Sequence, residues 1–338
     1  MASLAVKYRP KTFEEAVGQQ STVTILKRQI DLKQYKNAYI FCGASGCGKT
    51  TLARCFANAV NNYQGTPIEI DAASNNGVDN VRLIVDSAKE RSLDCEYKFV
   101  ILDEAHQLTT QSWNALLKII EEPPKYTIFI FCTTEPNKIP QTIQNRCQKF
   151  TFTKISNDGI FDRLKYICNQ EGIEYENDAL DYIVKLSNGG MRDAINNLEK
   201  VASYSDVVSI ESAINALGTF RYDDFFALMN NLIDGKDANV LSVIDNYYNS
   251  GNDLLSFVNQ FFVFVIDLSK YIIFKNMSCV KIPAMFEEDV KKTISIEDAL
   301  KYFDYVIENL LTLKTMLKNE PDILSTVEVM FLKVCRCK

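Results

Sequence analysis

The feature that most constrains the fold is the segment GASGCGKT at residues 43–50. It fits the pattern G-x-x-x-x-G-K-[ST], whose glycines let backbone N–H groups curl around phosphate oxygens. The apolar run NAYIFCG (37–43) precedes it, and a helix-forming stretch (50–61) follows it. A loop of this kind between a strand and a helix predicts an α/β fold with a phosphate-binding site.

The rest of the first half alternates in the same way. Apolar runs at 67–73, 97–105 and 127–134 are separated by helical stretches at 78–92 and 111–120. This alternation predicts a mostly parallel sheet, and the nearly continuous apolar runs indicate that both of its faces are covered. No strand pattern follows residue 153. We therefore expect an α/β domain at 1–153, a small helical domain at 154–218 and an all-helical domain at 219–338.

Composition excludes several other classes. The net charge of −6 gives no global basic surface for nucleic acid. The ten cysteines form no C-x-x-C pair and His106 is the one histidine, so we expect no zinc site. Without a signal peptide, the cysteines indicate reduced thiols in the cytoplasm. The apolar run at 254–274 contains Asp267 and Lys270, which favours a buried helix over a membrane span.

Two motifs together predict ATP hydrolysis. Lys49 is expected to reach the β and γ phosphates, and the Thr50 hydroxyl to bind Mg²⁺. The strand FVILDEAH ends in Asp103, a second Mg²⁺ ligand, and Glu104, a general base for water. Alone, this carboxylate pair could equally cap the next helix. The DEAH sequence is also a helicase signature, but the helical second half offers no second motor domain, so His106 is interpreted as a packing residue or as one that supports a residue of the site, rather than as a catalytic residue.

Three further polar residues are candidates. Thr134 ends an apolar run beside the expected γ-phosphate, although threonine is also an ordinary strand residue. Arg192 lies at a helix start, where the helix dipole disfavours a cation, so a phosphate partner or simple solvation would explain it. Arg146 lies in the polar segment NRC before the run KFTFT (149–153), where it either caps the last strand of the sheet or has a functional role.

In order along the chain, the segments KYRPKTFEEAVGQ (7–19), IEIDAASNNGVDNVR (68–82), NALLKIIEEPP (114–124), TTEPNKIPQTIQNRCQKF (133–150) and GGMRDAINNLEK (189–200) resemble those of AAA+ sliding-clamp loader ATPases. The similarity is greatest to the gamma/tau subunits of bacterial DNA polymerase III. It covers residues 4–200. The resemblance implies an AAA+ domain, a lid domain and a C-terminal collar for the three expected domains.

The resemblance also implies roles for residues. Arg146 would act as an arginine finger in the ATP site of a neighbouring subunit, although Asn145 replaces the serine of the family's Ser-Arg-Cys motif. Thr134 would be the first sensor and Arg192 the second. The residues implied to hold ATP are Tyr8, Arg9, Pro10, Val17, Gln19, Gly43, Ala44, Ser45, Gly46, Cys47, Gly48, Lys49, Thr50, Thr51 and Arg192.

By this resemblance the chain is an ATPase subunit of a pentameric loader that places a sliding clamp on primer–template DNA beside a replicative polymerase. The segment 56–70 lacks the four-cysteine zinc module usual in bacterial members, and the chain ends at 338 without a tau-like extension. A viral source or a divergent bacterium would both fit. Two alternatives stay open: an AAA+ helicase or remodelling ATPase, and a loader subunit that binds nucleotide without hydrolysing it.

Overall fold

The computed structural model describes residues 3–218, 220–318 and 320–336. The chain forms two compact units, Met1–Ile173 with Ile183–Glu199, and Glu174–Tyr182 with Lys200–Lys338. The division between them falls within helices α8 (Asn177–Leu186) and α9 (Met191–Tyr204). The separation of the chain into three domains at residues 153 and 218 stays a prediction.

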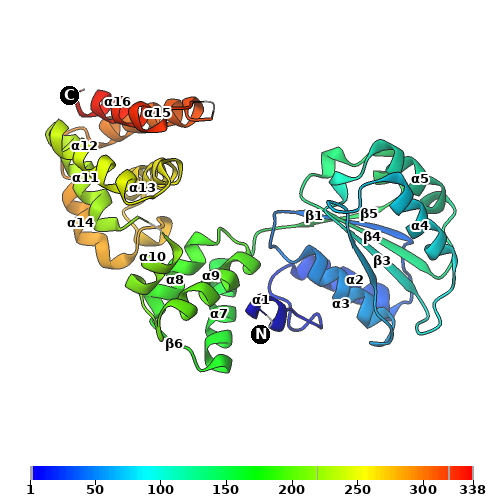
Figure 1. Cartoon of the computed structure of the whole chain (residues 1–338). Helices are drawn as coiled ribbons and strands as arrows, with labels where there is room; N and C mark the ends of the chain where they lie inside the picture. The colour runs from blue at the N-terminus through cyan, green and yellow to red at the C-terminus, as the bar shows by residue number, and fades with distance from the viewer. Residues whose placement is uncertain (1–2, 219, 319, 337–338) are drawn as a thin grey trace. The chain divides into compact units, whose positions relative to one another are not determined.

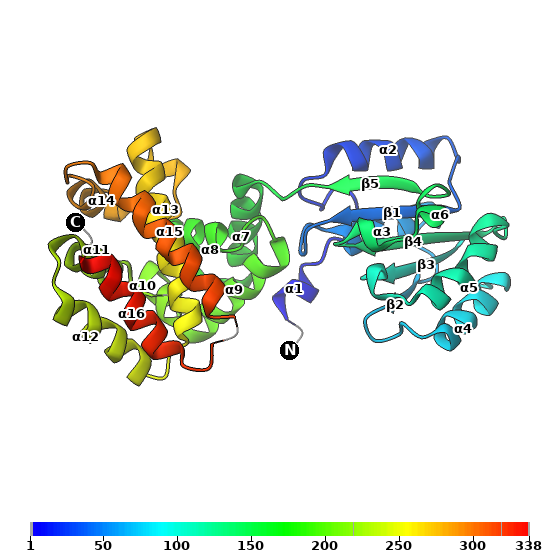
Figure 2. The same cartoon turned by 90° about the horizontal axis from the view of Figure 1, so that it is seen from above.

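The first unit is built on a five-stranded sheet in the order β2-β3-β4-β1-β5 (Figure 1; all five strands are labelled in Figure 2). Every neighbouring pair of strands is parallel, as the alternating pattern predicted. Because the strands are parallel, their carboxyl ends meet at one edge of the sheet. The strands are β1 (Ala38–Gly43), β2 (Ile68–Asp71), β3 (Lys98–Asp103), β4 (Thr127–Thr133) and β5 (Gln148–Phe152).

Helices cover both faces of this sheet (Figure 2). Strand β1 shows why: Tyr39 and Phe41 enter one core cluster, whereas Ile40 and Cys42 enter the other, as the two-residue period of a strand requires. The first cluster includes side chains of α2 and α3, and the second those of α4, α5 and α6. These helices are α2 (Gln20–Asp31), α3 (Lys49–Val60), α4 (Val78–Lys89), α5 (Thr110–Glu121) and α6 (Gln141–Gln144).

The first unit also contains α7 (Asn157–Glu171), whose ends follow from its sequence. The Ser156 side chain accepts a hydrogen bond from the Gly159 N–H and caps the start of the helix. Gly172 ends it in the left-handed conformation, with φ of 68°. Shorter elements of this unit are α1 (Leu4–Lys7), η1 (Ala105–Gln107) and η2 (Pro136–Lys138).

The second unit is helical except for one short pair of strands, which corrects the sequence analysis. Strands β6 (Glu174–Tyr175) and β7 (Val207–Val208) form a parallel pair, although no strand was expected after residue 153. Two residues are too few to give an alternating pattern. The helices are α10 (Ile210–Leu217), α11 (Tyr222–Asp234), α12 (Asp237–Asn249), α13 (Leu254–Phe274), η3 (Met277–Cys279), η4 (Ala284–Phe286), α14 (Glu287–Thr293), α15 (Ala299–Met316) and α16 (Ile323–Arg336).

Helix α13 is the apolar run that the sequence analysis interpreted as buried. Among the described residues it is the one helix long and apolar enough to cross a membrane by length and composition. Its side chains Phe257, Phe261 and Phe264 form an aromatic core with Phe225 of α11 and Phe331 of α16. Its buried carboxylate, Asp267, accepts a 2.7 Å hydrogen bond from the Lys281 N–H. The contacts of α13 are those of a core helix.

Candidate ATP site

The loop between β1 and α3 has the conformation that its glycines predict. Gly46 and Gly48 have φ of 71° and 98°, in the left-handed region that favours glycine. Gly43 is required for a different reason: a Cβ atom there would lie 2.5 Å from the Phe152 carbonyl oxygen of β5. The loop therefore lies against the carboxyl end of the sheet and leads directly into the N-terminus of α3, which favours anions.

Lys49 is buried, and neutral backbone groups hold its ammonium group. The residue is 6% exposed to solvent. Its Nζ donates to the carbonyl oxygens of Gly43 and Ala44, each at 2.9 Å. Carbonyl oxygens orient the ammonium group but bring no opposite charge to it, and burial of a cation is costly until an anion pairs with it. Lys49 therefore fits an anionic group such as a phosphate.

Thr50 and Asp103 come together as the sequence predicted. The Thr50 hydroxyl donates to Asp103 Oδ2 at 2.8 Å, and Asp103 Oδ1 accepts a 3.0 Å hydrogen bond from the Glu104 N–H. A hydroxyl and a single carboxylate beside a phosphate site suit Mg²⁺, which binds few protein ligands and keeps several waters. These two residues fit a magnesium ion that a nucleotide brings with it. Within the described part of the chain, no group of three or more His, Cys, Asp or Glu side chains could hold a metal.

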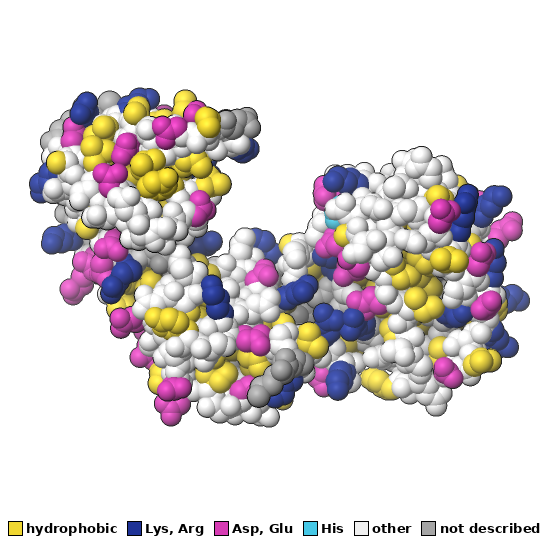
Figure 3. Space-filling model, viewed as in Figure 1, with side chains coloured by type: hydrophobic (Ala, Val, Ile, Leu, Met, Phe, Trp, Pro, Cys, Tyr) yellow, Lys and Arg dark blue, Asp and Glu magenta, His cyan; other side chains and the backbone are white. Residues whose placement is uncertain are grey.

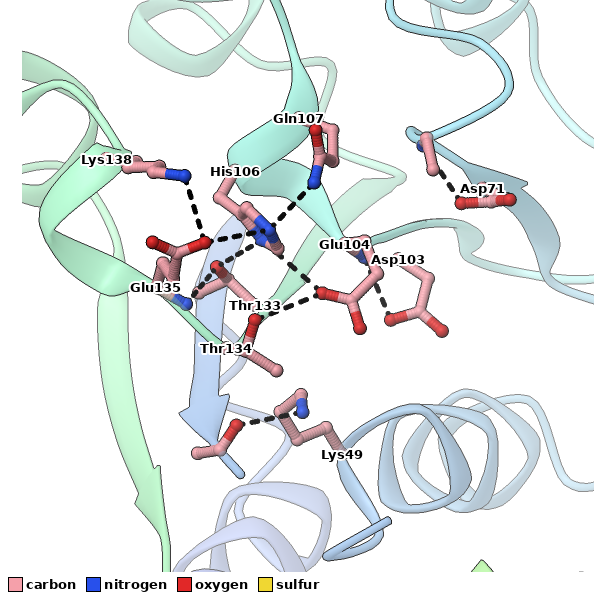
Figure 4. A network of polar contacts seen from close by, with 12 residues as sticks. Lys49, Asp71, Asp103, Glu104, His106, Gln107, Thr133, Thr134, Glu135 and Lys138 are labelled. Carbon is pink, nitrogen blue, oxygen red and sulfur yellow. Dashed lines mark hydrogen bonds and ion pairs between the residues drawn. The ribbon is translucent and has the colours of Figure 1, made fainter. Parts of the chain in front are cut away.

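Glu104 has a strained backbone, with φ of 46° in a residue that is not glycine. It lines the same cavity as the phosphate loop. Its Oε2 accepts a long hydrogen bond of 3.4 Å from Thr134 Oγ1, and it lies 3.3 Å from His106 Nδ1 (Figure 4). The sequence analysis interpreted His106 as a packing or supporting residue and did not name this contact. The signal was its position two residues after Glu104.

The residues expected around the nucleoside line one cavity with the phosphate loop. They are Tyr8, Arg9, Pro10, Val17 and Gln19, and Arg192, the expected second sensor, lines the same cavity. The Gln19 side chain joins two parts of this wall, since its Nε2 donates to the carbonyl oxygens of Cys47 and Thr153. Burial lowers the pKa of Arg9, and hydrogen bonding with Glu171 raises the pKa of Tyr8 to about 12. The sequence analysis missed other cavity-lining residues: Ser3, Ala5, Val6, Glu69, Arg163, Met191, Ile195 and Asn196.

The phosphate loop also contacts the start of α9, the helix that carries Arg192. The Met191 N–H donates to the Gly46 carbonyl oxygen at 3.1 Å. A Cβ atom at Gly46 would lie 3.1 Å from Gly190 Cα, which is closer than nearly all real Cβ contacts. This direct backbone contact places Arg192 at the cavity.

We expect Gly46→Ala to lower both stability and nucleotide affinity. The alanine would face a positive φ and the Gly190 backbone, so the free energy of unfolding should fall by about 1–3 kcal/mol. Denaturant unfolding and ATP titration measure the two effects. Gly77→Ala is a matched control, because the Gly77 φ is −73° and a Cβ there meets nothing within 4 Å. Equal stability and affinity for Gly46→Ala and wild type would contradict this view of the contact.

Arg146 does not reach the cavity. Its Nη1 donates to the Thr142 carbonyl oxygen at 2.7 Å, and its Nη2 pairs with Glu121 at 2.7 Å. Tyr39 of β1 pairs with Gln148, and Gly43 with Phe152, so Arg146 precedes the amino end of β5. The phosphate loop follows the opposite end of β1, about 13 Å farther along the strands at 3.3 Å per residue. Arg146 therefore lies at the amino ends of the parallel strands, and the cavity lies at their carboxyl ends, on the opposite edge of the sheet.

Solved structures with the same fold define the class of this domain. Thermotoga maritima RuvB, a Holliday junction branch migration motor, has a TM-score of 0.54 at 19% identity, covering 67% of this chain and 79% of that one. The described sheet, phosphate loop and helical regions are those of an AAA+ fold with a helical C-terminal region.

Sequence comparisons identify the family within that class. Residues 67–156 match the family model "DNA polymerase III, delta subunit", and residues 159–203 match "DNA polymerase III clamp loader subunit, ATPase lid domain". The gamma/tau subunit of Mycoplasma genitalium is 37% identical over 80% of this chain and 49% of its own length. The tau subunit of Bacillus subtilis is 36% identical over 78% and 51%, and that of Escherichia coli 33% over 72% and 41%.

The chain belongs to the family of DNA polymerase III clamp-loader subunits and is a homologue of the gamma/tau subunits. It spans about half the length of these relatives. The relatives named here are bacterial proteins, so the comparisons give no support to a viral source.

Proposed function

We propose that the chain is an ATP-hydrolysing motor subunit of a sliding-clamp loader, which opens the clamp and places it on primer–template DNA during replication. One observation carries the proposal. A single cavity brings together the buried cation Lys49, the pair Thr50–Asp103 and the carboxylate of Glu104. These are the groups that bind phosphates, hold a magnesium ion and activate water.

The roles of the residues follow from this arrangement. Backbone N–H groups of the loop and Lys49 bind the phosphates, and Arg192 approaches them from α9. Glu104 accepts a proton from the attacking water, and Thr134 orients the Glu104 carboxylate. A bound Mg²⁺ would neutralise charge that develops on the phosphate oxygens. Tyr8, Arg9, Pro10, Val17 and Gln19 enclose the nucleoside.

Arg146 completes the site of a neighbouring subunit. Its position at the sheet edge remote from its own cavity supports this role, because a head-to-tail ring brings opposite edges of successive subunits together. The guanidinium would stabilise charge on the transferred phosphoryl group in that neighbour. Glu121, with which it pairs here, would give it up when the neighbour binds ATP.

The proposal implies partners and a place in the cell. Other loader subunits would form a pentameric ring with this chain, held by residues 219–338 as a collar. The clamp, primer–template DNA and the replicative polymerase would be the remaining partners, in the cytoplasm. Charged side chains of both signs are interspersed on the face shown in Figure 3, so DNA contact would be confined to a local surface of the ring.

The test of the proposal is ATP-dependent clamp loading. The full chain, its co-encoded loader subunits and the clamp are mixed with primed circular DNA, and clamp retained on the DNA is measured. We expect retention that requires both ATP and this chain. Strand separation without a clamp would instead support a helicase. Nucleotide binding without turnover, even with clamp and DNA, would support a non-hydrolysing scaffold.

A further inference from the structure

His106 lies between two carboxylates that come from different elements. Its Nδ1 is 3.3 Å from Glu104 Oε2, and its Nε2 is 3.3 Å from Glu135 Oε1 (Figure 4). The imidazole is buried, with 6% of its side chain exposed, whereas 36% of the Glu104 side chain and 47% of the Glu135 side chain are exposed. The ring is therefore the fixed member of this group.

Neighbouring side chains hold the orientation of the ring. Thr133 Oγ1 lies 3.2 Å from Nδ1 and accepts a 3.0 Å hydrogen bond from the Glu135 N–H. The Gln107 amide nitrogen lies 3.1 Å from Nε2. When that amide donates to Nε2, the ring proton resides on Nδ1, the nitrogen that faces Glu104. The protonated Nδ1 then faces two acceptors, Thr133 Oγ1 at 3.2 Å and Glu104 Oε2 at 3.3 Å.

We propose that His106 is a positioning residue that fixes the Glu104 carboxylate at the edge of the ATP cavity. The inference rests on the proposed function in taking Glu104 as the general base. Among the described residues, the Glu104 carboxylate has one hydrogen-bond partner besides His106, the Thr134 hydroxyl at 3.4 Å. Thr134 alone would leave the carboxylate free to turn about its side-chain bonds. The imidazole supplies a second, rigid contact.

The same ring connects Glu104 to the segment that leads to Arg146. Glu135 contacts Nε2 and pairs with Lys138 of η2 at 3.0 Å. The chain then passes through α6 to Arg146. His106 therefore joins the base that a subunit uses in its own cavity to the segment that carries the arginine it lends to its neighbour.

Nuclear magnetic resonance of the imidazole tests the contact without any ATP turnover. His106 is the one histidine in the chain, so its ¹⁵N signals are unambiguous. We expect a protonated Nδ1, with a shift in its signal in Glu104→Gln that exceeds the shift at Nε2. Glu135→Gln should affect Nε2 more. The exposed Glu90→Gln is the control and should move neither. Imidazole ¹⁵N signals whose positions are unchanged in Glu104→Gln would overturn the proposal.

Kinetics test whether the contact positions the base. A misplaced catalytic group costs on the order of 10–100-fold, so His106→Ala should lower kcat by that factor and leave ATP affinity unchanged. His106→Asn keeps an amide donor near the place of Nδ1 and should recover more activity than His106→Gln, whose amide lies nearer Nε2. Unchanged kcat in His106→Ala, or equal recovery by both amides, would refute the positioning role.

A double variant separates action through Glu104 from a general structural role. In a Glu104→Gln background, His106→Ala should cause no further loss, because the carboxylate it positions is already absent. A multiplicative further loss would show that His106 acts elsewhere. If the wild-type chain shows no turnover at all, the proposed function fails, and the ¹⁵N signals alone decide whether His106 holds Glu104.

Discussion

Chains carrying Lys49→Ala and chains carrying Arg146→Ala should each be nearly inactive alone and should regain ATP turnover when mixed. Lys49→Ala removes the cation of a chain's own cavity. Arg146→Ala removes the guanidinium that the chain would lend under the proposed function, and an arginine finger is worth about 10³–10⁵ in rate. The structure places the two residues at opposite edges of the sheet, so one interface of a mixed ring can combine both intact residues.

The size of the recovered ATP turnover in the mixture can be predicted. In a random, equal mixture of the two variants, about a quarter of the head-to-tail interfaces pair an intact Lys49 with an intact Arg146. Turnover should approach that fraction of the wild-type rate, measured with clamp, primed DNA and the other loader subunits. The exposed Arg28→Ala is the matched control and should keep full activity. If both variants assemble and mixing restores nothing, Arg146 does not act in a neighbouring site.

Glu104→Gln should bind ATP with nearly normal affinity and hydrolyse it very slowly. The amide keeps the shape of the side chain and its place beside Thr134, but it cannot accept a proton from water. Loss of a general base costs about 10²–10⁴ in rate. Phosphate release measured beside equilibrium ATP binding tests this. Glu90→Gln serves as the control, and normal turnover in Glu104→Gln would remove Glu104 from the mechanism.

The sequence predicted the centre of the site because its parts are local or follow from parallel strands. The phosphate loop is contiguous, and Asp103 and Thr133 end strands whose carboxyl ends meet at one edge. The AAA+ fold that this pattern and the family resemblance implied is confirmed. The structure shows where the individual site residues lie, and their roles remain predictions.

What the sequence could not show depends on contacts between distant segments. Gln19 adopts a φ of 58° and bonds to Cys47 and Thr153, a contact that no local pattern encodes. The sequence could not show which carboxylates His106 contacts, because Glu135 lies 29 residues later, on the far side of α5 and β4. The sequence made Arg146 conspicuous, but only the register of β1 and β5 shows at which edge it lies.

The hydrogen bond from Met191 to Gly46 has a thermodynamic consequence. The carbonyl of the phosphate loop and the first turn of α9 stabilise each other, so the two segments have a shared coupling free energy. Coupling of this kind is reciprocal. If a ligand on the loop stabilises the ordered start of α9 by some free energy, the ordered start of α9 raises the affinity for that ligand by the same free energy. The helix that carries Arg192 is thus energetically coupled to the phosphate site. A ligand at that site would favour one position of the helix, and the position of the helix would change the affinity for the ligand.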